Sequence, residues 1–411
     1  MCNNVKLTSF DNGIRLLYSY DNSPVVYCGF AINAGTRDEW TNEYGIAHLI
    51  EHLLFKGTNK RNSLQIIKRL EEVGGELNAY TTKEETFIYA VVPHKYTERA
   101  IELLSDIVFN SVFPENQIKK EREVIFEEIE MYNDTPSELI FDELEDLMFT
   151  NSSLGHNILG TKKSLSKINS SDCINFVKRC YTTDNMLFFL HGSIDENKFL
   201  KLTQKHICHT ATKREFSRNS PNPYLPQTVV CNKNTSQTHC LIGNLTLSLS
   251  DNNTSSLTLL NNILGGTSLT SKLNLAIRER NGWVYAIDSS LNLYSDVGVW
   301  CIYFGCSESN YKKCIELIYS ELNKLTNKTI PDKQLERYKQ QLYGQILINY
   351  QNKENYILSS AKIALHLNKA VSMERTFEQI QQIRPEEIQT LASQLFDNKR
   401  FTTLKYQKYS E

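Results

Sequence analysis

The sequence of 411 residues has no apolar stretch long enough to cross a membrane, since runs such as 186–190 fall far short of the ~20 residues that span a bilayer. The residues after Met1 also lack the apolar segment of a secretion signal, so we expect no export by that route and no membrane partner. Ten cysteines are present without any Cys-x-x-Cys pair, which favours a reduced, cytoplasmic setting.

An excess of charge of either sign is also missing. Lys and Arg number 45 against 47 Asp and Glu, a formal charge of -2, which argues against a nucleic-acid or anionic-membrane partner. With only 9 Pro and 17 Gly, and with 40% hydrophobic residues, the chain is neither disordered nor fibrous. Its length favours a globular protein of two domains.

Hydrophobic periodicity predicts helices and strands along both halves of the chain. Asp11-Asn12-Gly13 is a turn signal, and it predicts that a hairpin opens the fold. The elements expected next are helices at 46–55 and 63–73, strands at 76–81 and 86–92, and helices at 96–109 and 114–132. Those expected in the second half are a strand at 238–245, a helix at 255–264, strands at 283–293 and 297–304, and a helix at 310–325.

The order of elements in the second half echoes that of the first, although the two halves share little identity. Between them, residues 213–228 concentrate proline and polar side chains, which is typical of a linker. We therefore expect two related α+β domains, residues 1–212 and 229–411, joined by that linker.

The strongest chemical signal is the segment His48-Leu49-Ile50-Glu51-His52. Histidines four residues apart on a helix leave the same face and can bind one cation, and Glu51 lies close enough to act as a general base. His-x-x-Glu-His is the inverted form of the zincin motif. A helix that merely carries two solvated histidines and a glutamate is the alternative. The second half has Thr258-Leu259-Leu260-Asn261-Asn262 at the corresponding place, which cannot perform this chemistry.

A catalytic zinc site of this type needs a third protein ligand. In the expected helix 114–132, Glu121 and Glu128 share a face with apolar residues, whereas Glu123 and Glu127 point elsewhere. Glu128 is therefore favoured over Glu127. Two carboxylates on an otherwise apolar face are costly unless a cation lies opposite. A charged helix edge is the alternative.

Several segments together resemble the pitrilysin or insulinase family of zinc peptidases, which includes the mitochondrial processing peptidase. They are Ala34-Gly35-Thr36-Arg37, His48 to His52, Phe55-Lys56-Gly57-Thr58, Gly75-Glu76-Leu77-Asn78-Ala79-Tyr80-Thr81 and the segment from Glu121 to Glu128. The resemblance covers nearly the whole chain. It implies two domains of the processing-peptidase type, each a mostly antiparallel sheet with packed helices, and one zinc ion per chain, held by the first domain.

The resemblance also implies roles for individual residues. His48, His52 and Glu128 would be the zinc ligands, Glu51 the general base, and Glu121 an outer carboxylate that orients a histidine ligand. An extended substrate would pair with the strand 76–81 near Asn78 and Ala79.

In the second half, Arg278 and Tyr285 resemble the family's arginine and tyrosine pair, seven positions apart, which reaches the substrate near the metal. Such groups can hydrogen-bond a peptide carbonyl and its developing oxyanion. Without the resemblance, a helix-ending arginine and a buried strand tyrosine would be the simpler interpretation. Trp283 departs from the family, where a smaller aliphatic residue is frequent.

We therefore expect a zinc-dependent endopeptidase that acts on peptides or unfolded segments with weak sequence preference. One alternative is a non-catalytic or partner subunit, which the family also contains, and another is a different zinc hydrolase on the same scaffold. Relatives enclose substrates in a chamber of four homologous domains, so a chain with two domains is expected to form a dimer. A homodimer is favoured because both site elements occur here, and a heterodimer with a degenerate relative is the alternative.

Overall fold

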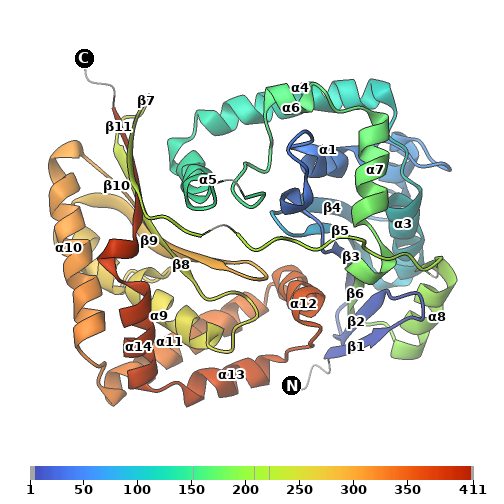
Figure 1. Ribbon diagram of the computed structural model, residues 1–411. Coiled ribbons are helices and arrows are strands. Elements are labelled where there is room, and N and C mark those ends of the chain that lie inside the picture. Colours follow the sequence, from blue (N-terminus) through green and yellow to red (C-terminus); the bar gives the residue numbers. More distant parts are fainter. Residues whose placement is uncertain (1–4, 151, 208, 222, 409–411) are drawn as a thin grey trace. The chain divides into compact units, whose positions relative to one another are not determined.

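The computed structural model describes residues 5–150, 152–207, 209–221 and 223–408 (Figure 1). These residues form two compact units. The first comprises the chain up to Ile129, His156–Asn219 and Asn349–Ser372, and the second comprises Glu130–Gly155, Ser220–Ile348 and the chain from Met373. Within the described ranges, no helix combines the length and the hydrophobicity needed to cross a membrane.

A six-stranded sheet in the order β1-β2-β6-β3-β5-β4 forms the centre of the first unit. Its strands are β1 (Val5–Ser9), β2 (Arg15–Tyr20), β3 (Val25–Ile32), β4 (Glu76–Thr81), β5 (Thr86–Pro93) and β6 (Met186–Gly192). Neighbouring strands are antiparallel except β2 and β6, which are parallel. Strand β4 lies at one edge, so only one of its sides is paired within the sheet.

Helices surround this sheet, some in direct contact with its strands and others packed on those helices. They are α1 (Ile46–Leu53), α2 (Ser63–Glu71), α3 (Thr97–Asn110), α4 (Glu115–Asn133), α6 (Lys162–Leu165), α7 (Ser170–Cys180), α8 (Glu196–Ile207) and α12 (Lys353–Leu367), with short 3-10 turns η1 (Thr36–Asp38), η2 (His94–Tyr96) and η3 (Thr183–Asn185). Alternate residues of β3, such as Phe30 and Ile32, enter a large core with residues of α1 and α3. The ring of Phe30 meets Phe188 of β6 edge-on, with centroids 4.9 Å apart.

The other face of the first sheet is covered by α12, a helix from the second half of the sequence. Phe87 and Phe189 of the sheet pack there with Ile357 and Leu365 of α12. The remaining buried positions of the helix are alanines, which give only a weak hydrophobic signal, and the sequence patterns above do not predict this helix.

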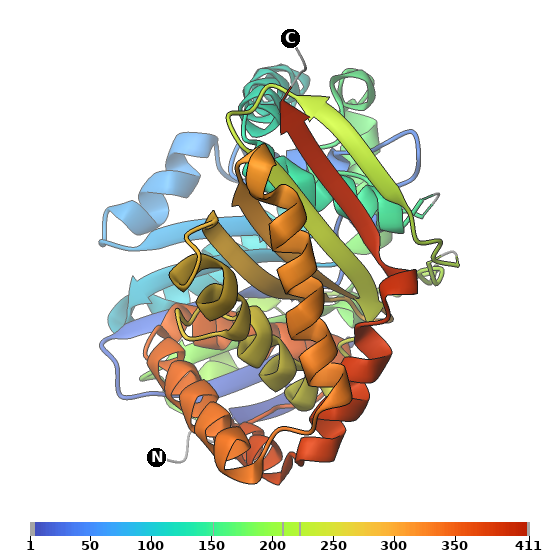
Figure 2. The same cartoon turned by 90° about the vertical axis from the view of Figure 1, so that its left-hand side faces the viewer.

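The second unit contains a five-stranded sheet in the order β7-β11-β8-β10-β9. Its strands are β7 (Thr228–Lys233), β8 (Thr238–Thr246), β9 (Val284–Leu293), β10 (Gly298–Cys306) and β11 (Thr402–Lys408). Its other elements are α5 (Pro136–Met148), α9 (Thr254–Gly265), the π-helix η4 (Asn274–Glu279), α10 (Glu308–Asn327), α11 (Asp332–Tyr350), α13 (Met373–Gln382), α14 (Pro385–Leu395) and η5 (Asn398–Arg400). In Figure 2 the orange helix α10 lies in front of this sheet, and its residues share a core with those of α9 and α14. Helix α5 covers the opposite face.

The two sheets have the same topology. Leaving out β1, the strands of each sheet are arranged first, fifth, second, fourth, third in chain order, and in each the first and fifth strands are the parallel pair. Helix α1 packs on β4 as α9 packs on β9. The predicted pair of related α+β domains with mostly antiparallel sheets is therefore confirmed.

Most predicted elements are found within a few residues of their expected bounds. The opening hairpin is present, with Ser9 opposite Arg15, and the strands expected at 76–81 and 86–92 are β4 and β5. In the second half, the helix expected at 310–325 is α10, which is longer at both ends. Boundaries differ because helix ends depend on capping contacts that periodicity does not reveal.

The compact units differ in extent from the predicted sequence domains. Helix α5 belongs to the second unit and α12 to the first, and the units divide between Asn219 and Ser220, inside the segment 213–228. The first part of that segment is docked, because Arg218 forms an ion pair of 2.7 Å with the buried Asp38. The compact units group residues that pack together, whereas the predicted bounds 1–212 and 229–411 mark where one repeat of the element order ends and the next begins. The units therefore do not test those bounds, which stay a prediction.

Candidate active site

Helix α1 has a core face and a polar face. Its apolar residues Ile46, Leu49, Ile50 and Leu53 are buried in the first unit's core. This spacing leaves His48, Glu51 and His52 half-buried on the remaining surface of the helix. Hydrophobic packing of one face therefore fixes the direction of the three chemical side chains.

The structure brings both histidines close to Glu128 on α4. Nε2 of His48 lies 3.9 Å from Oε2 of Glu128, and Nε2 of His52 lies 3.7 Å from Oε1 of the same carboxylate. Each of the three residues offers one potential ligand atom, and these three atoms all lie within 4.8 Å of one another. Glu127, the competing candidate of the sequence analysis, is exposed, and it is not one of the three residues whose potential ligand atoms converge.

The donor set fits a zinc ion. Ligand atoms ~2.0–2.1 Å from a tetrahedral zinc lie ~3.4 Å apart. The two separations between a histidine nitrogen and a Glu128 oxygen, 3.9 Å and 3.7 Å, exceed this value by about half an ångström at most. A histidine must be neutral to bind a metal, and burial lowers the pKa of His48 to about 4, with His52 acting in the same direction. Two imidazoles and one carboxylate leave a fourth position open, which is the arrangement of catalytic rather than structural zinc sites.

Glu121 contacts the far side of one histidine. Its Oε2 lies 3.3 Å from Nδ1 of His52, and its Oε1 lies 2.8 Å from Nζ of Lys56. An Nδ1–H donated to Glu121 leaves Nε2 of His52 free to bind a metal. Sequence reasoning assigned no role to Lys56, although its position four residues after His52 is a signal that could have indicated it.

Glu51 lies on α1 between the two histidines in the sequence, and it faces Thr81 at the end of β4. Burial raises the pKa of its carboxyl above the ordinary value, Glu128 acts in the same direction, and Thr81 and His52 oppose the shift. A carboxylate in this environment is a stronger base than one in open water.

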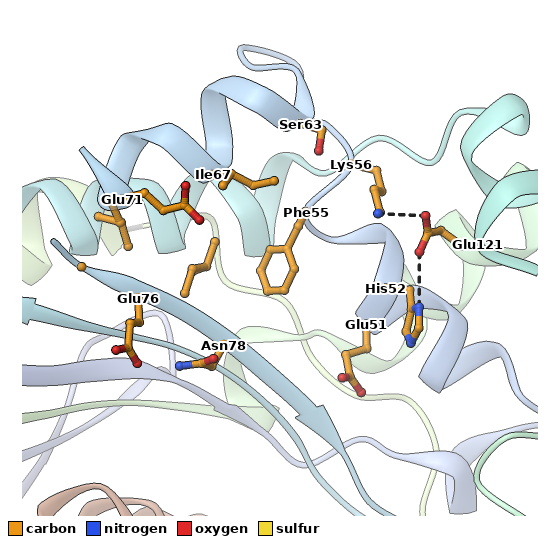
Figure 3. A pocket seen from close by; sticks show the side chains of 13 residues that line it. Glu51, His52, Phe55, Lys56, Ser63, Ile67, Glu71, Glu76, Asn78 and Glu121 are labelled. Carbon is orange, nitrogen blue, oxygen red and sulfur yellow. Dashed lines mark hydrogen bonds and ion pairs between the residues drawn. The ribbon is translucent and has the colours of Figure 1, made fainter. Parts of the chain in front are cut away.

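A pocket of about 590 Å³ adjoins Glu51 and His52 (Figure 3). Phe55, Ile67 and Leu77 contribute apolar surface to its wall. Two exposed carboxylates, Glu71 at the end of α2 and Glu76 at the start of β4, also line it. The pocket therefore combines an apolar wall with negative charge.

Asn78 and Ala79 lie on the edge strand β4, opposite Tyr89 and Ile88 of β5. Asn78 also lines the pocket. Because β4 ends the sheet, its outer edge can accept a further strand, as substrate pairing would require. The substrate-binding role of both residues stays a prediction.

Arg278 and Tyr285 lie in the second unit. Arg278 is near the end of η4, with a side chain 39% exposed, and Tyr285 is on β9 and is 83% exposed. A buried strand tyrosine, the simpler interpretation above, is therefore wrong. Gly282 forms the turn between them, with a φ of 62° that favours glycine. Whether the two residues reach the metal site stays a prediction.

A second cluster with metal-ligating residues consists of Glu84, Glu85 and His366. Here other side chains already pair with the carboxylates, because Glu85 lies 2.7 Å from Nε2 of His366 and 3.0 Å from Nζ of Lys362. Although burial opposes it, contact with these groups lowers the pKa of Glu85 to about 2. Glu84 lies 2.6 Å from the buried Arg37. This cluster is therefore better explained as a structural ion-pair network than as a metal site.

Two related α+β domains, with a His-x-x-Glu-His helix in only one of them, define the class of inverted-motif zinc peptidases. The family model described as insulinase (peptidase family M16) matches residues 15–162, and the one described as peptidase M16 inactive domain matches residues 167–342. The chain belongs to the insulinase family, peptidase family M16. The second match agrees with the absence of the metal motif from the second half.

Curated relatives match over nearly the full chain. An uncharacterized zinc protease of Bacillus subtilis, YmxG, is 31% identical over 395 residues, which are 95% of this chain and 96% of the relative. An uncharacterized zinc protease of Mycobacterium leprae is 30% identical over 381 residues, which are 91% of this chain and 84% of the relative.

Solved structures share the fold. One described as a peptidase M16 inactive domain, from Pseudomonas fluorescens, has a TM-score of 0.92 at 17% identity and covers 99% of both chains. One described as a protease from Helicobacter pylori has a TM-score of 0.89 at 19% identity, covering 99% of this chain and 100% of that one. At these identities the likeness supports the fold alone.

Proposed function

We propose that the protein is a zinc-dependent endopeptidase that hydrolyses peptides or unfolded segments. The observation that carries the proposal is the convergence of His48, His52 and Glu128 beside Glu51. Bound zinc would supply a Lewis acid that lowers the pKa of water and polarises a carbonyl. Glu51 takes a proton from the attacking water and returns it to the leaving amine. Glu121 holds His52 in the tautomer that binds the metal.

Substrate binding is proposed to use the outer edge of β4. A peptide that adds to this edge would form backbone hydrogen bonds near Asn78 and Ala79, which select an extended conformation rather than a sequence. A segment whose backbone groups are already paired within a folded protein cannot add to this edge. Arg278 and Tyr285 are proposed to hydrogen-bond the substrate carbonyl, since both are exposed and carry donors.

The pocket beside Glu51 is proposed to receive one substrate side chain. Its apolar wall suits a hydrophobic stem, and Glu71 and Glu76 suit a positive end, so a lysine or arginine side chain would fit both. The preference should be modest, because exposed ion pairs contribute little in water.

Digestion of denatured protein fragments tests the proposal. We expect the zinc-loaded protein to cleave internal peptide bonds, to lose this activity on chelation and to regain it with zinc. Mass spectrometry of the products gives the cleavage positions and shows whether basic residues are enriched next to them. Small amides and esters are assayed in parallel. Cleavage of those substrates without any peptide hydrolysis would favour a different zinc hydrolase, and no hydrolysis by zinc-loaded protein would favour a non-catalytic partner subunit.

We also propose that the active form is a dimer, with identical chains favoured over a degenerate partner. The resembled peptidases enclose substrate with four homologous domains, and this chain supplies two. Light scattering across a dilution series, with activity measured on the same samples, is expected to show that activity follows the dimer. Full activity of a monomer, at concentrations without detectable dimer, would contradict this proposal.

A further inference from the structure

Helix α1 starts without a capping side chain of its own. Gly45 precedes its first residue, with a φ of 92°, and a Cβ there would lie 2.7 Å from the carbonyl oxygen of Leu159. The backbone N–H groups of the first turn still need acceptors. Glu39 provides two of them, because Oε2 accepts a hydrogen bond from the Gly45 N–H and Oε1 accepts one from the Ala47 N–H, each 2.8 Å long. The N–H of Ile46 donates to the carbonyl oxygen of Glu43, 3.0 Å away.

Glu39 has a fully buried side chain, and a buried carboxylate is costly unless it is paired. Nε2 of His156 lies 2.8 Å from Oε2 of Glu39 and donates to it. The imidazole of His156 stacks on the ring of Tyr44, with centroids 3.8 Å apart and planes 8° apart. Three donors thus converge on one carboxylate, and the residue that carries the third donor is itself held by an aromatic ring.

This arrangement connects directly to the metal site. His48 follows Ala47, whose N–H is fixed by Glu39, and His52 lies one turn later, where Glu121 contacts it. A change at the start of α1 would therefore move His48 relative to His52 and Glu128. A shift of a fraction of an ångström matters, because the donor atoms must approach to ~2 Å from one ion.

We propose that Glu39 is a positioning residue for the metal site, with His156 as its partner. By holding the first turn of α1, the pair fixes the distance between His48 and the other two donors. This inference rests on the proposed zinc site and goes beyond it, because neither residue is one of the three converging donors. A cap that only stabilises the helix is the competing explanation.

Measuring the metal affinity of the Glu39→Gln variant distinguishes a positioning residue from a cap that only stabilises the helix. The amide keeps the size of the side chain but replaces one acceptor oxygen with an N–H donor, which cannot accept from the backbone N–H or from His156. We expect zinc affinity, measured by chelator competition, to fall by roughly 10- to 100-fold, as for other groups that support metal ligands. The visible absorption spectrum of the Co²⁺-substituted protein should change, because it reports the geometry of the ligands.

Asn169→Ala is the matched control. Asn169 caps α7 by accepting hydrogen bonds from two backbone N–H groups, as Glu39 does for α1, but α7 carries no proposed metal ligand. We expect this variant to lose thermal stability while its zinc affinity and cobalt spectrum stay as in the wild type. If Glu39→Gln behaves like this control, the positioning role is refuted.

His156→Gln provides a second test should Glu39→Gln fail to fold. It removes the imidazole and leaves Glu39 in place. We therefore expect zinc affinity to fall and the cobalt spectrum to change in the same direction as in Glu39→Gln, but by a smaller amount. Zinc affinity and a cobalt spectrum equal to those of the wild type would then refute the proposal. Wild-type protein that binds zinc but cleaves no peptide would instead refute the endopeptidase, and wild-type protein that binds no metal would refute the site itself.

Discussion

Glu51→Gln is expected to lower peptide turnover by roughly 10²–10⁴-fold, the usual contribution of a general base, while the protein keeps its zinc. Glutamine has nearly the same shape but cannot take a proton from water. Glu51 is not one of the three converging donors, so the set of metal ligands stays complete. Initial rates on a quenched fluorescent peptide, with zinc content verified in the same samples, measure the effect.

Glu127→Gln is the matched control for this substitution. It makes the same chemical change at an exposed position of α4, next in sequence to a proposed ligand but outside the group of converging donors. Turnover in this variant should stay near that of the wild type. A Glu51→Gln variant with wild-type rates would remove Glu51 from its proposed role.

Alanine in place of His48, His52 or Glu128 is expected to abolish stoichiometric zinc binding and, with it, hydrolysis. The loss in affinity should exceed the roughly 10- to 100-fold that outer groups contribute, because a direct bond to the ion is removed. The three donors lie within 4.8 Å of one another, and two of them belong to the same helix. Elemental analysis after dialysis against a weak chelator gives the zinc content of each variant.

Glu127→Ala is the informative comparison here, because it tests which of two neighbouring glutamates on α4 binds the metal. Zinc content near one ion per chain is expected for this variant, since Glu127 is exposed and Glu128 faces the histidines. Full zinc occupancy after Glu128→Ala, with loss after Glu127→Ala, would show that the assigned register is wrong.

The sequence predicts those parts of the fold in which local pattern and tertiary packing agree. Helix α1 shows its period through strongly apolar residues such as Leu49 and Ile50, and it is found where expected. Helix α12 also has a helical period, but two of its four buried residues are Ala361 and Ala364, and its partner sheet is remote in sequence. Periodicity identifies a buried face and does not identify what covers it.

The same distinction applies to the site. His48 and His52 share a helix, and Glu128 follows from the helical face of α4, so their convergence could be predicted. Glu39 and His156 are separated by 117 positions, and neither belongs to a spaced motif. Their pairing results from tertiary packing, which a single sequence does not reveal. The domain bounds, the roles of the site residues and the dimer stay predictions.

The placement of α5 and α12 has a consequence for how the protein would respond to cleavage. A cut between Asn219 and Ser220 would produce two fragments, each of which contains the helix that completes the hydrophobic core of the other fragment's sheet. Neither fragment would bury both faces of its own sheet alone. Folding of the two halves is therefore mutually dependent, and a nicked protein would remain a complementing pair rather than separate into independent domains.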